Sequence, residues 1–242
     1  MQKACIVIPC YNESTRLDLS VFNSFIKNYL TIDFLFVNDG SSDNTLDLLE
    51  KFRTDNHQRV LVLNLDENSG KAEAVRQGVL EVCKNKEYEY VGFWDADLAT
   101  PLSEIINFLR QIENETIKIA IGSRMRRLGA NVERKFVRHI MGRVFSTFSS
   151  IILKLPVYDT QCGAKLFHSD LVHLFEEKFI TSWLFDIELL DRYRNKFGVS
   201  ATMIQVLEVP VNEWIEKGDS RLKLKHMLKV PFELIIISRK YN

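Results

Sequence analysis

The sequence lacks the cysteine pattern of a disulfide-stapled or zinc-binding protein. Its four cysteines lie at positions 5, 10, 83 and 162, and they form no C-x-x-C pair and no spacing typical of zinc ligands. Cysteines without such a pattern are typical of reduced thiols in a cytoplasmic protein. We therefore expect a cytoplasmic chain whose thiols are free.

Long hydrophobic runs are also absent. The first apolar run, Ala4 to Ile8, is short and strand-like, so it predicts no signal peptide. The apolar stretch from Leu234 to Ile237 is far shorter than the roughly 20 residues of a membrane-spanning helix. The sequence predicts no transmembrane segment.

Neither a dinucleotide-binding nor a nucleic-acid-binding protein is favoured. No G-x-G-x-x-G motif follows the first predicted strand, and no aromatic residues are interleaved with the arginines as in an RNA-reading motif. The chain has 242 residues, 46% of them hydrophobic, with no repeats and no long linker. This length and composition are sufficient for one α/β domain with a full core.

Four predicted strands alternate with helical patterns in the first hundred residues. The strands cover Ala4 to Pro9, where proline ends the strand, then Phe34 to Val37, Val60 to Leu65, and Val91 to Trp94. Such alternation indicates a parallel sheet with flanking helices, and a fifth strand is predicted over Ile119 to Ser123. Ligands bind at the carboxyl edge of such sheets.

Two aspartates mark that edge. The fourth strand runs directly into Asp95, Ala96 and Asp97, and strand alternation places both carboxylates on one face. Two ionised carboxylates held close repel each other unless a cation lies between them, and oxygen ligands suit Mg²⁺ or Mn²⁺. We therefore predict a divalent metal held by Asp95 and Asp97.

Several ordered motifs resemble family 2 glycosyltransferases with the GT-A fold. They are Cys5 to Glu13, Val37 to Asp43, Asn68 to Ala72, and Asp95 to Asp97. In the second half, Gly122 to Arg124, Asp159 to Phe167 and Trp183 to Leu190 resemble the polyprenyl-phosphate branch, most of all the dolichyl-phosphate glucosyltransferases. The resemblance covers roughly residues 4 to 215 and leaves the C-terminal end nearly unmatched. We therefore predict a GT-A domain over residues 1–215 and a helical extension over residues 216–242.

The resemblance implies a binding site for a nucleotide sugar. Asp97 would ligate the metal and act in catalysis, and Asp95 would share the metal or the ribose. Asp39 would read the uracil edge, with Pro9, Tyr11 and Glu13 around the base and ribose. Lys71 is either a nucleotide contact or an ordinary lysine at a helix start. The expected donor-binding residues are Pro9, Tyr11, Glu13, Asp39, Lys71, Asp95, Ala96 and Asp97.

A basic cluster follows the fifth strand. Residues 124 to 143 contain seven Lys and Arg side chains and a single Glu, for a net charge of +6. The cluster is either a solvated helix face or a site for an anionic acceptor, because guanidinium groups form paired hydrogen bonds with phosphate oxygens. In the resembling family this segment holds the lipid phosphate, which implies that role for Arg124, Arg134 and Arg138.

Three further acidic residues have open roles. By resemblance, Asp159 lies near the acceptor and orients the attacking oxygen, although it could also be a turn aspartate. Asp186 and Glu188 lie in an apolar stretch, so they either meet cations or face the cleft. Trp183 is either a sugar platform or core.

The sugar is inferred from one position. The resembling mannose synthases carry glutamine two residues after the second aspartate, where this chain has Ala99. This difference favours UDP-glucose over GDP-mannose.

The C-terminal extension is basic and amphipathic. Between positions 217 and 229 it has five basic residues and one acidic residue, beside apolar ones, and Pro231 is expected to kink or divide the helix. Such a helix lies on anionic lipid, packs on its own domain, or forms a homodimer contact.

Together these features predict an inverting, metal-dependent hexosyltransferase. It would move glucose from UDP-glucose to a polyprenyl phosphate, peripherally on the cytoplasmic face of a membrane. The alternative is a family 2 glycosyltransferase with a soluble or glycan hydroxyl acceptor in cell-surface polysaccharide synthesis, which would need a carboxylate base at Asp159 or Asp186.

Overall fold

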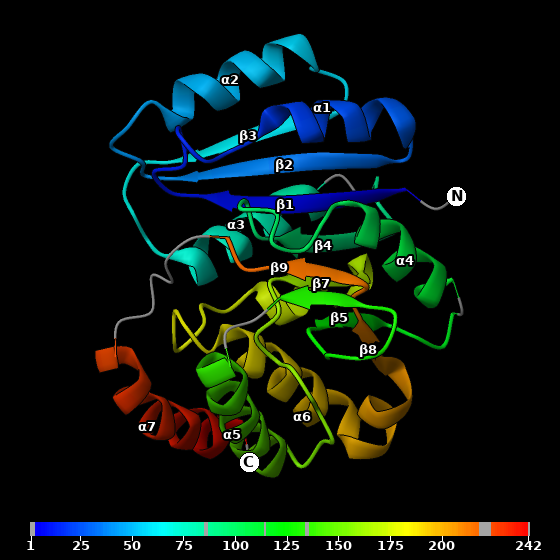
Figure 1. The fold of residues 1–242 in the computed structure, drawn as a ribbon, viewed down its shortest axis with the longest axis vertical. Helices are drawn as coiled ribbons and strands as arrows, with labels where there is room; N and C mark the ends of the chain where they lie inside the picture. The colour runs from blue at the N-terminus through cyan, green and yellow to red at the C-terminus, as the bar shows by residue number, and fades with distance from the viewer. Residues whose placement is uncertain (1–2, 85–86, 114, 134–135, 218–223, 242) are drawn as a thin grey trace. The chain divides into compact units, whose positions relative to one another are not determined.

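The computed structural model describes residues 3–84, 87–113, 115–133, 136–217 and 224–241, with the backbone alone for 136–139 and 224–231 (Figure 1). The chain forms two compact units, each made of segments that are not contiguous in sequence. Unit 1 contains residues 1–98 and 163–178, and unit 2 contains residues 99–162 and 179–242.

Unit 1 is built on a mostly parallel sheet. Its strands, in spatial order β3-β2-β1-β4-β7, are β3 (Val60–Leu65), β2 (Ile32–Asp39), β1 (Ala4–Cys10), β4 (Tyr90–Trp94) and β7 (Ala164–His168). The first four are parallel and β7 pairs antiparallel with β4. Because the parallel strands end at one edge, the loops after β1, β2 and β4 lie at the same edge.

Helices cover both faces of this sheet (Figure 1). Alternation along β2 (Ile32–Asp39) puts Phe34 and Phe36 on one face, where Phe22 packs edge-on against both rings. Val37 lies on the other face, where a Cβ at Gly78 would overlap it, so this glycine lets its helix approach the sheet closely. The helices of unit 1 are α1 (Leu19–Asn28), α2 (Thr45–Asp55), α3 (Lys71–Cys83) and the short 3₁₀ helix η1 (Ser169–Phe175).

The described residues of unit 2 form two parallel strand pairs and four helices. Strand β5 (Ile119–Ser123) pairs with β8 (Val206–Pro210), and β6 (Asn131–Glu133) pairs with β9 (Glu213–Ile215). The helices are α4 (Ser103–Ile112), α5 (Phe136–Leu153), α6 (Phe185–Gln205) and α7 (Leu224–Tyr241). Helix α7 packs against α5 and α6.

The predicted alternation of strands and helices is confirmed, with two corrections. Strand β1 does not end at Pro9 but continues to Cys10. Its pairing with β4 stops at Val7, so the missing N–H of Pro9 costs no hydrogen bond on that side. Strand β4 ends at Trp94, so Asp95 and Asp97 lie in the turn that follows rather than on the strand.

The remaining expectations concern the thiols and the C-terminal helix. All four cysteines are free, as predicted. Helix α7 is one continuous helix through Pro231 and is not divided there. Within the described parts of the chain, no helix has both the length and the apolar character needed to cross a membrane.

Candidate functional site

The loops after β1 and β2 are tied together by short polar side chains. Asn12 has a φ of 52°, and its Oδ1 accepts a hydrogen bond from the N–H of Ser42 at 2.9 Å. Asp43 accepts from the Ser14 hydroxyl at 2.6 Å and from the Thr45 N–H at 3.0 Å. Hydrogen bonds from Ser14 and Thr45 lower the pKa of Asp43 to about 2. These bonds order the sheet edge where a ligand is expected.

The three predicted donor residues of the first loop differ in exposure. Pro9 is part of β1, and Tyr11 follows the strand with 36% of its surface exposed. Glu13 is buried, and its carboxylate accepts hydrogen bonds from Arg16 at 2.9 and 3.0 Å. Of the three, Tyr11 has the side chain that is open to solvent.

Asp39 is the last residue of β2 and precedes the second loop at this edge of the sheet. Its buried carboxylate accepts hydrogen bonds from the backbone N–H groups of Ser69 at 2.8 Å and Gly70 at 2.9 Å, and from the Asn68 amide at 3.1 Å. Gly40 has a φ of 60°, and a Cβ there would overlap the backbone at Asn68. Asp39 therefore fixes the turn that precedes α3, and its predicted contact with uracil stays a prediction.

Lys71 and Asp95 meet at the end of β4. The Lys71 ammonium lies 2.5 Å from Asp95 Oδ1, so the structure places this lysine beside the first of the two aspartates, and its contact with a nucleotide stays a prediction. Gly163 lies against Asp95 in two ways. Its carbonyl accepts a hydrogen bond from the Asp95 backbone N–H at 2.9 Å, and a Cβ at position 163 would overlap the Asp95 carboxylate. Glycine is required here by the close approach of the carboxylate.

The donor set at this turn fits a divalent cation. Asp95 and Asp97 share one turn, closed by a hydrogen bond of 3.2 Å from the Leu98 N–H to the Asp95 carbonyl. The Asp95 side chain is 40% exposed and Asp97 is partly exposed, so solvent and ligands reach both. Among the described residues, no group of three or more His, Cys, Asp or Glu side chains is arranged so that it could hold a metal ion. Two carboxylates are typical of Mg²⁺ or Mn²⁺ sites that leave positions for water and phosphate oxygens.

In unit 2, Arg124 and Asp159 form a bidentate ion pair. Arg124 Nε lies 2.6 Å from Asp159 Oδ2, and Nη2 lies 2.8 Å from Oδ1. The backbone N–H of Arg124 donates to Oδ2 at 3.1 Å, and that of Gln161 donates to Oδ1 at 3.1 Å. Arg124 and Asp159, which were predicted separately, are thus direct partners. Asp159 occupies the Nε and Nη2 donors of the arginine.

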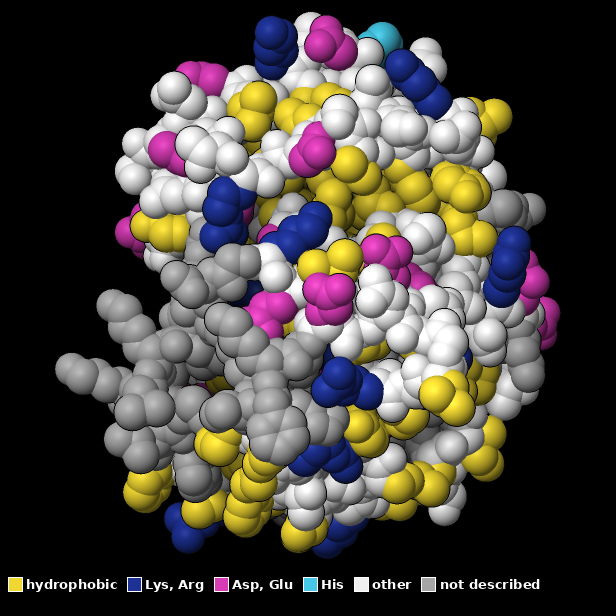
Figure 2. Space-filling view, in the orientation of Figure 1, with side chains coloured by type: hydrophobic (Ala, Val, Ile, Leu, Met, Phe, Trp, Pro, Cys, Tyr) yellow, Lys and Arg dark blue, Asp and Glu magenta, His cyan; other side chains and the backbone are white. Residues whose placement is uncertain are grey.

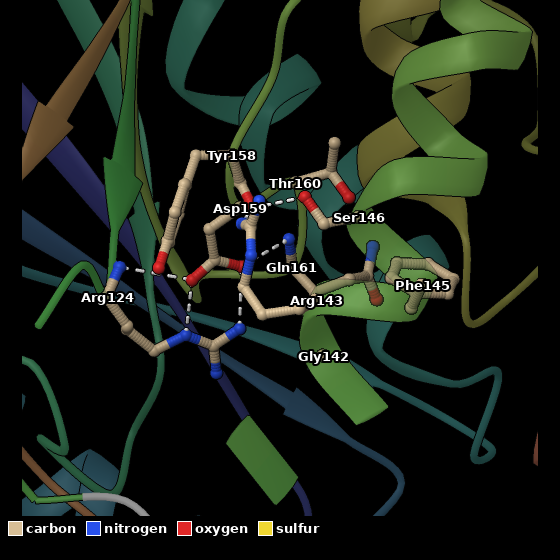
Figure 3. A pocket seen from close by; sticks show the side chains of 9 residues that line it. All are labelled: Arg124, Gly142, Arg143, Phe145, Ser146, Tyr158, Asp159, Thr160 and Gln161. Carbon is tan, nitrogen blue, oxygen red and sulfur yellow. Dashed lines mark hydrogen bonds and ion pairs between the residues drawn. The ribbon is translucent and has the colours of Figure 1, made fainter. Parts of the chain in front are cut away.

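A small cavity of about 40 Å³ lies beside this pair (Figure 3). The Arg143 guanidinium stacks over the Tyr158 ring at 3.7 Å and donates to the Tyr158 carbonyl at 3.1 Å. Two guanidinium groups and one carboxylate therefore face the cavity. Its lining residues are Arg124, Gly142, Arg143, Phe145, Ser146, Tyr158, Asp159, Thr160 and Gln161.

Other predicted residues lie elsewhere. Arg134 is outside the described residues, and Arg138 lies in α5 with a side chain that is not described. Glu188 is buried and meets a cation, since Arg192 Nη2 lies 2.8 Å from its Oε1. Asp186 is also buried, and Trp183 is 38% exposed.

Two residues of the unit 2 site were not predicted from sequence. Arg143 lies within the basic cluster of residues 124–143, where its charge alone indicates no separate role, and Glu208 lies outside the motifs that carry the resemblance. Glu208 interrupts an apolar strand, and burial raises its pKa. A carboxylate in such a strand is the signal that could have identified it.

Comparison with known proteins shows which family this chain resembles in sequence. The family model for glycosyl transferase family 2 matches residues 5–175. A dolichyl-phosphate beta-glucosyltransferase of Trichomonas vaginalis is 32% identical over 246 residues, which cover 96% of this chain and 69% of that protein. The dolichyl-phosphate beta-glucosyltransferase of Saccharomyces cerevisiae is 31% identical over 259 residues, covering 98% of this chain and 74% of that protein.

Solved structures show the same fold. Glucosyl-3-phosphoglycerate synthase from Mycobacterium tuberculosis, in complex with Mn²⁺ and UDP-glucose, superposes with a TM-score of 0.69 at 16% identity, covering 99% of this chain and 79% of that one. Its complex with Mg²⁺ and UDP gives a TM-score of 0.69 at 17% identity, covering 98% and 80%. The predicted GT-A fold is confirmed. Because the family model spans most of the sequence and the relatives match nearly all of it, the chain belongs to glycosyl transferase family 2 and is a glycosyltransferase.

Proposed function

We propose that the enzyme transfers glucose from UDP-glucose to a polyprenyl phosphate with inversion at the anomeric carbon. The observation that carries this proposal is the similarity, along nearly the whole chain, to proteins named dolichyl-phosphate beta-glucosyltransferase. The reduced thiols are compatible with the cytoplasmic face of a membrane as the place of reaction.

The donor is assigned to unit 1. Asp95 and Asp97 would hold Mg²⁺ or Mn²⁺, which when bound stabilises negative charge on the departing diphosphate. Lys71 orients Asp95 through their ion pair and adds positive charge beside the phosphates. The uracil and ribose are assigned to the loops after β1 and β2. The residues proposed for the donor are Pro9, Tyr11, Glu13, Asp39, Lys71, Asp95, Ala96 and Asp97.

The acceptor phosphate is assigned to unit 2. One of its oxygens attacks the anomeric carbon, a new carbon–oxygen bond forms, and the bond from that carbon to the diphosphate breaks to release UDP. A phosphate monoester with a second pKa of about 6 already presents an ionised oxygen near neutral pH, so no base is needed. Arg124 with Arg134 and Arg138 would bind this phosphate, and Arg143 is a further candidate because it faces the cavity.

The state of Asp159 favours a phosphate acceptor over a hydroxyl. A hydroxyl must lose a proton to a carboxylate base during attack. Both oxygens of Asp159 already accept hydrogen bonds from Arg124, at 2.6 and 2.8 Å. A carboxylate engaged in this way is suited to orienting the arginine, so we assign Asp159 to positioning in catalysis rather than to proton abstraction.

A donor and acceptor panel tests this function. We expect glucosyl transfer from UDP-glucose to polyprenyl phosphate with Mn²⁺ or Mg²⁺ present, and none to the matching polyprenol, which lacks the phosphate. GDP-mannose should be a poor donor. Preference for GDP-mannose, or efficient transfer to a glycan hydroxyl, would refute the assignment and support the alternative acceptor class.

We further propose peripheral contact with the membrane that holds the acceptor. Helix α7 buries Leu234 and Ile237 but leaves Phe232 69% exposed. Figure 2 shows hydrophobic side chains gathered over the α5 and α7 end of unit 2. Exposed apolar area next to basic residues is typical of a surface that lies on anionic lipid. The exposed apolar residues are Ile140, Met141, Val144, Phe148 and Ile151 on α5, and Phe232, Ile235 and Ile236 on α7.

Liposome binding tests this contact. We expect co-sedimentation with phosphatidylserine vesicles that falls as salt rises, because salt screens the charges, and that falls strongly in the double variant Phe232→Gln, Ile236→Gln. Deleting residues 217–242 would be a poor test, since the Tyr241 hydroxyl donates to buried Glu188 at 2.9 Å. The control is Leu30→Gln, which removes an exposed leucine of unit 1. Equal binding by all three proteins, or a homodimer that covers this face, would contradict the proposal.

A further inference from the structure

Glu208 holds the loop that carries Asp159. It lies on β8, and its two carboxylate oxygens accept hydrogen bonds from two successive backbone N–H groups. Oε2 accepts from Tyr158 at 2.8 Å, and Oε1 accepts from Asp159 at 2.6 Å. Hydrogen bonds to an ionised acceptor are roughly twice as strong as neutral ones, so this contact fixes the peptide immediately before the Asp159 side chain.

The same strand pair also fixes Arg124. Strand β8 is paired with β5 so that Pro210 lies opposite Ser123, the residue before Arg124. The Val211 N–H donates to the Ser123 carbonyl at 3.0 Å and extends this pairing. Strand β8 therefore holds both partners of the ion pair. It contacts Asp159 through the Glu208 side chain, and it fixes Arg124 through the backbone pairing.

We propose that Glu208 is a positioning residue of the acceptor site, which sets the orientation of Asp159 and through it the direction of the Arg124 guanidinium. The inference rests on the proposed function, since it takes the Arg124 side of unit 2 as the acceptor site. Glu208 is not among the residues that line the cavity, and both of its oxygens are engaged by backbone. It acts through Asp159 and not on the substrate.

Glu208→Gln tests the proposal. An amide offers one acceptor atom where two N–H groups need two, so its NH₂ group would face a backbone N–H. We expect kcat/KM for the acceptor to fall roughly tenfold or more, since small displacements of a positioning group have such effects. UDP affinity measured by calorimetry should not change, because the donor residues lie in unit 1. Glu208→Asp keeps the charge but shortens the side chain, and it should show the same selective loss if the glutamine variant does not fold.

A double-mutant cycle separates positioning from general stability. If Glu208 acts through Asp159, adding Glu208→Gln to Asp159→Asn should lower acceptor kcat/KM little further. The matched control is Glu104→Gln, which removes the charge of a buried carboxylate of unit 2 that also accepts a backbone N–H, from Asn212 at 2.8 Å. It should leave acceptor kinetics unchanged.

Additive losses in the cycle, or unchanged acceptor kinetics in both Glu208 variants, would overturn the inference. Kinetics are measured with whichever acceptor the wild-type enzyme uses. Failure of the wild type to use polyprenyl phosphate would therefore count against the proposed function and not against the role of Glu208.

Discussion

Asp97→Asn should lower turnover by roughly 10²- to 10³-fold, because removing one group that stabilises developing negative charge has effects of this size. The substitution keeps the size of the side chain but removes the charge that would hold the cation. Affinity for UDP in the presence of Mn²⁺ should fall to the level that the wild type shows in EDTA. Calorimetry with UDP, with and without Mn²⁺, measures this directly and does not depend on turnover.

Asp55→Asn is the matched control for this variant. Asp55 is an exposed aspartate at the end of α2 in the same unit, so its replacement should change neither turnover nor UDP affinity. Equal UDP affinity of the wild type in Mn²⁺ and in EDTA would contradict the proposal that Asp95 and Asp97 hold a metal ion. Full turnover by Asp97→Asn would remove the assigned role of Asp97.

The local architecture of unit 1 could be predicted because it follows from local patterns. Buried strands such as Tyr90–Trp94 are short apolar runs, and their alternation with helices determines a parallel sheet. The antiparallel strand Ala164–His168 could not be placed in the same way. Its partner, β4, lies about seventy residues earlier in the chain, and a short apolar run does not reveal the direction of its pairing.

The residues of the candidate site differ in the same way: those close in sequence could be predicted, and contacts between distant residues could not. Asp95 and Asp97 could be recognised because the two carboxylates are neighbours in sequence. The pairing of Arg124 with Asp159 spans 35 residues, and the contact of Glu208 with the Asp159 N–H spans 49. No local spacing encodes such contacts, because they depend on how the strands and loops of unit 2 pack. The roles of Arg124 and Asp159 were predicted by resemblance, whereas their mutual neutralisation required the structure.

Gly163→Ala should lower turnover by roughly 10- to 100-fold, since displacement of a catalytic group by about 1 Å has effects of this order. A Cβ at position 163 would overlap the carboxylate of Asp95, so this side chain must move from its contact with Lys71. Mn²⁺-dependent UDP affinity should fall with turnover, because Asp95 is one of the two proposed ligands.

Gly198→Ala distinguishes displacement of Asp95 from a general effect of replacing glycine. Gly198 lies within α6 with a φ of 84° and a ψ of 162°. Apart from its chain neighbours and the backbone of its own helix, no atom of the described residues lies within 4 Å of the place that a Cβ would take. An alanine there strains the backbone by about 1–3 kcal/mol, so this variant should melt at a lower temperature yet keep its turnover.

Gly163→Ala should show the opposite pattern, with a large loss of turnover in a protein that still folds by circular dichroism. The difference arises because the new methyl group at position 163 meets the Asp95 carboxylate, whereas the one at position 198 meets open space. If Gly163→Ala retains wild-type turnover, the geometry of Asp95 does not limit the reaction, and the contact with Gly163 is a matter of packing alone.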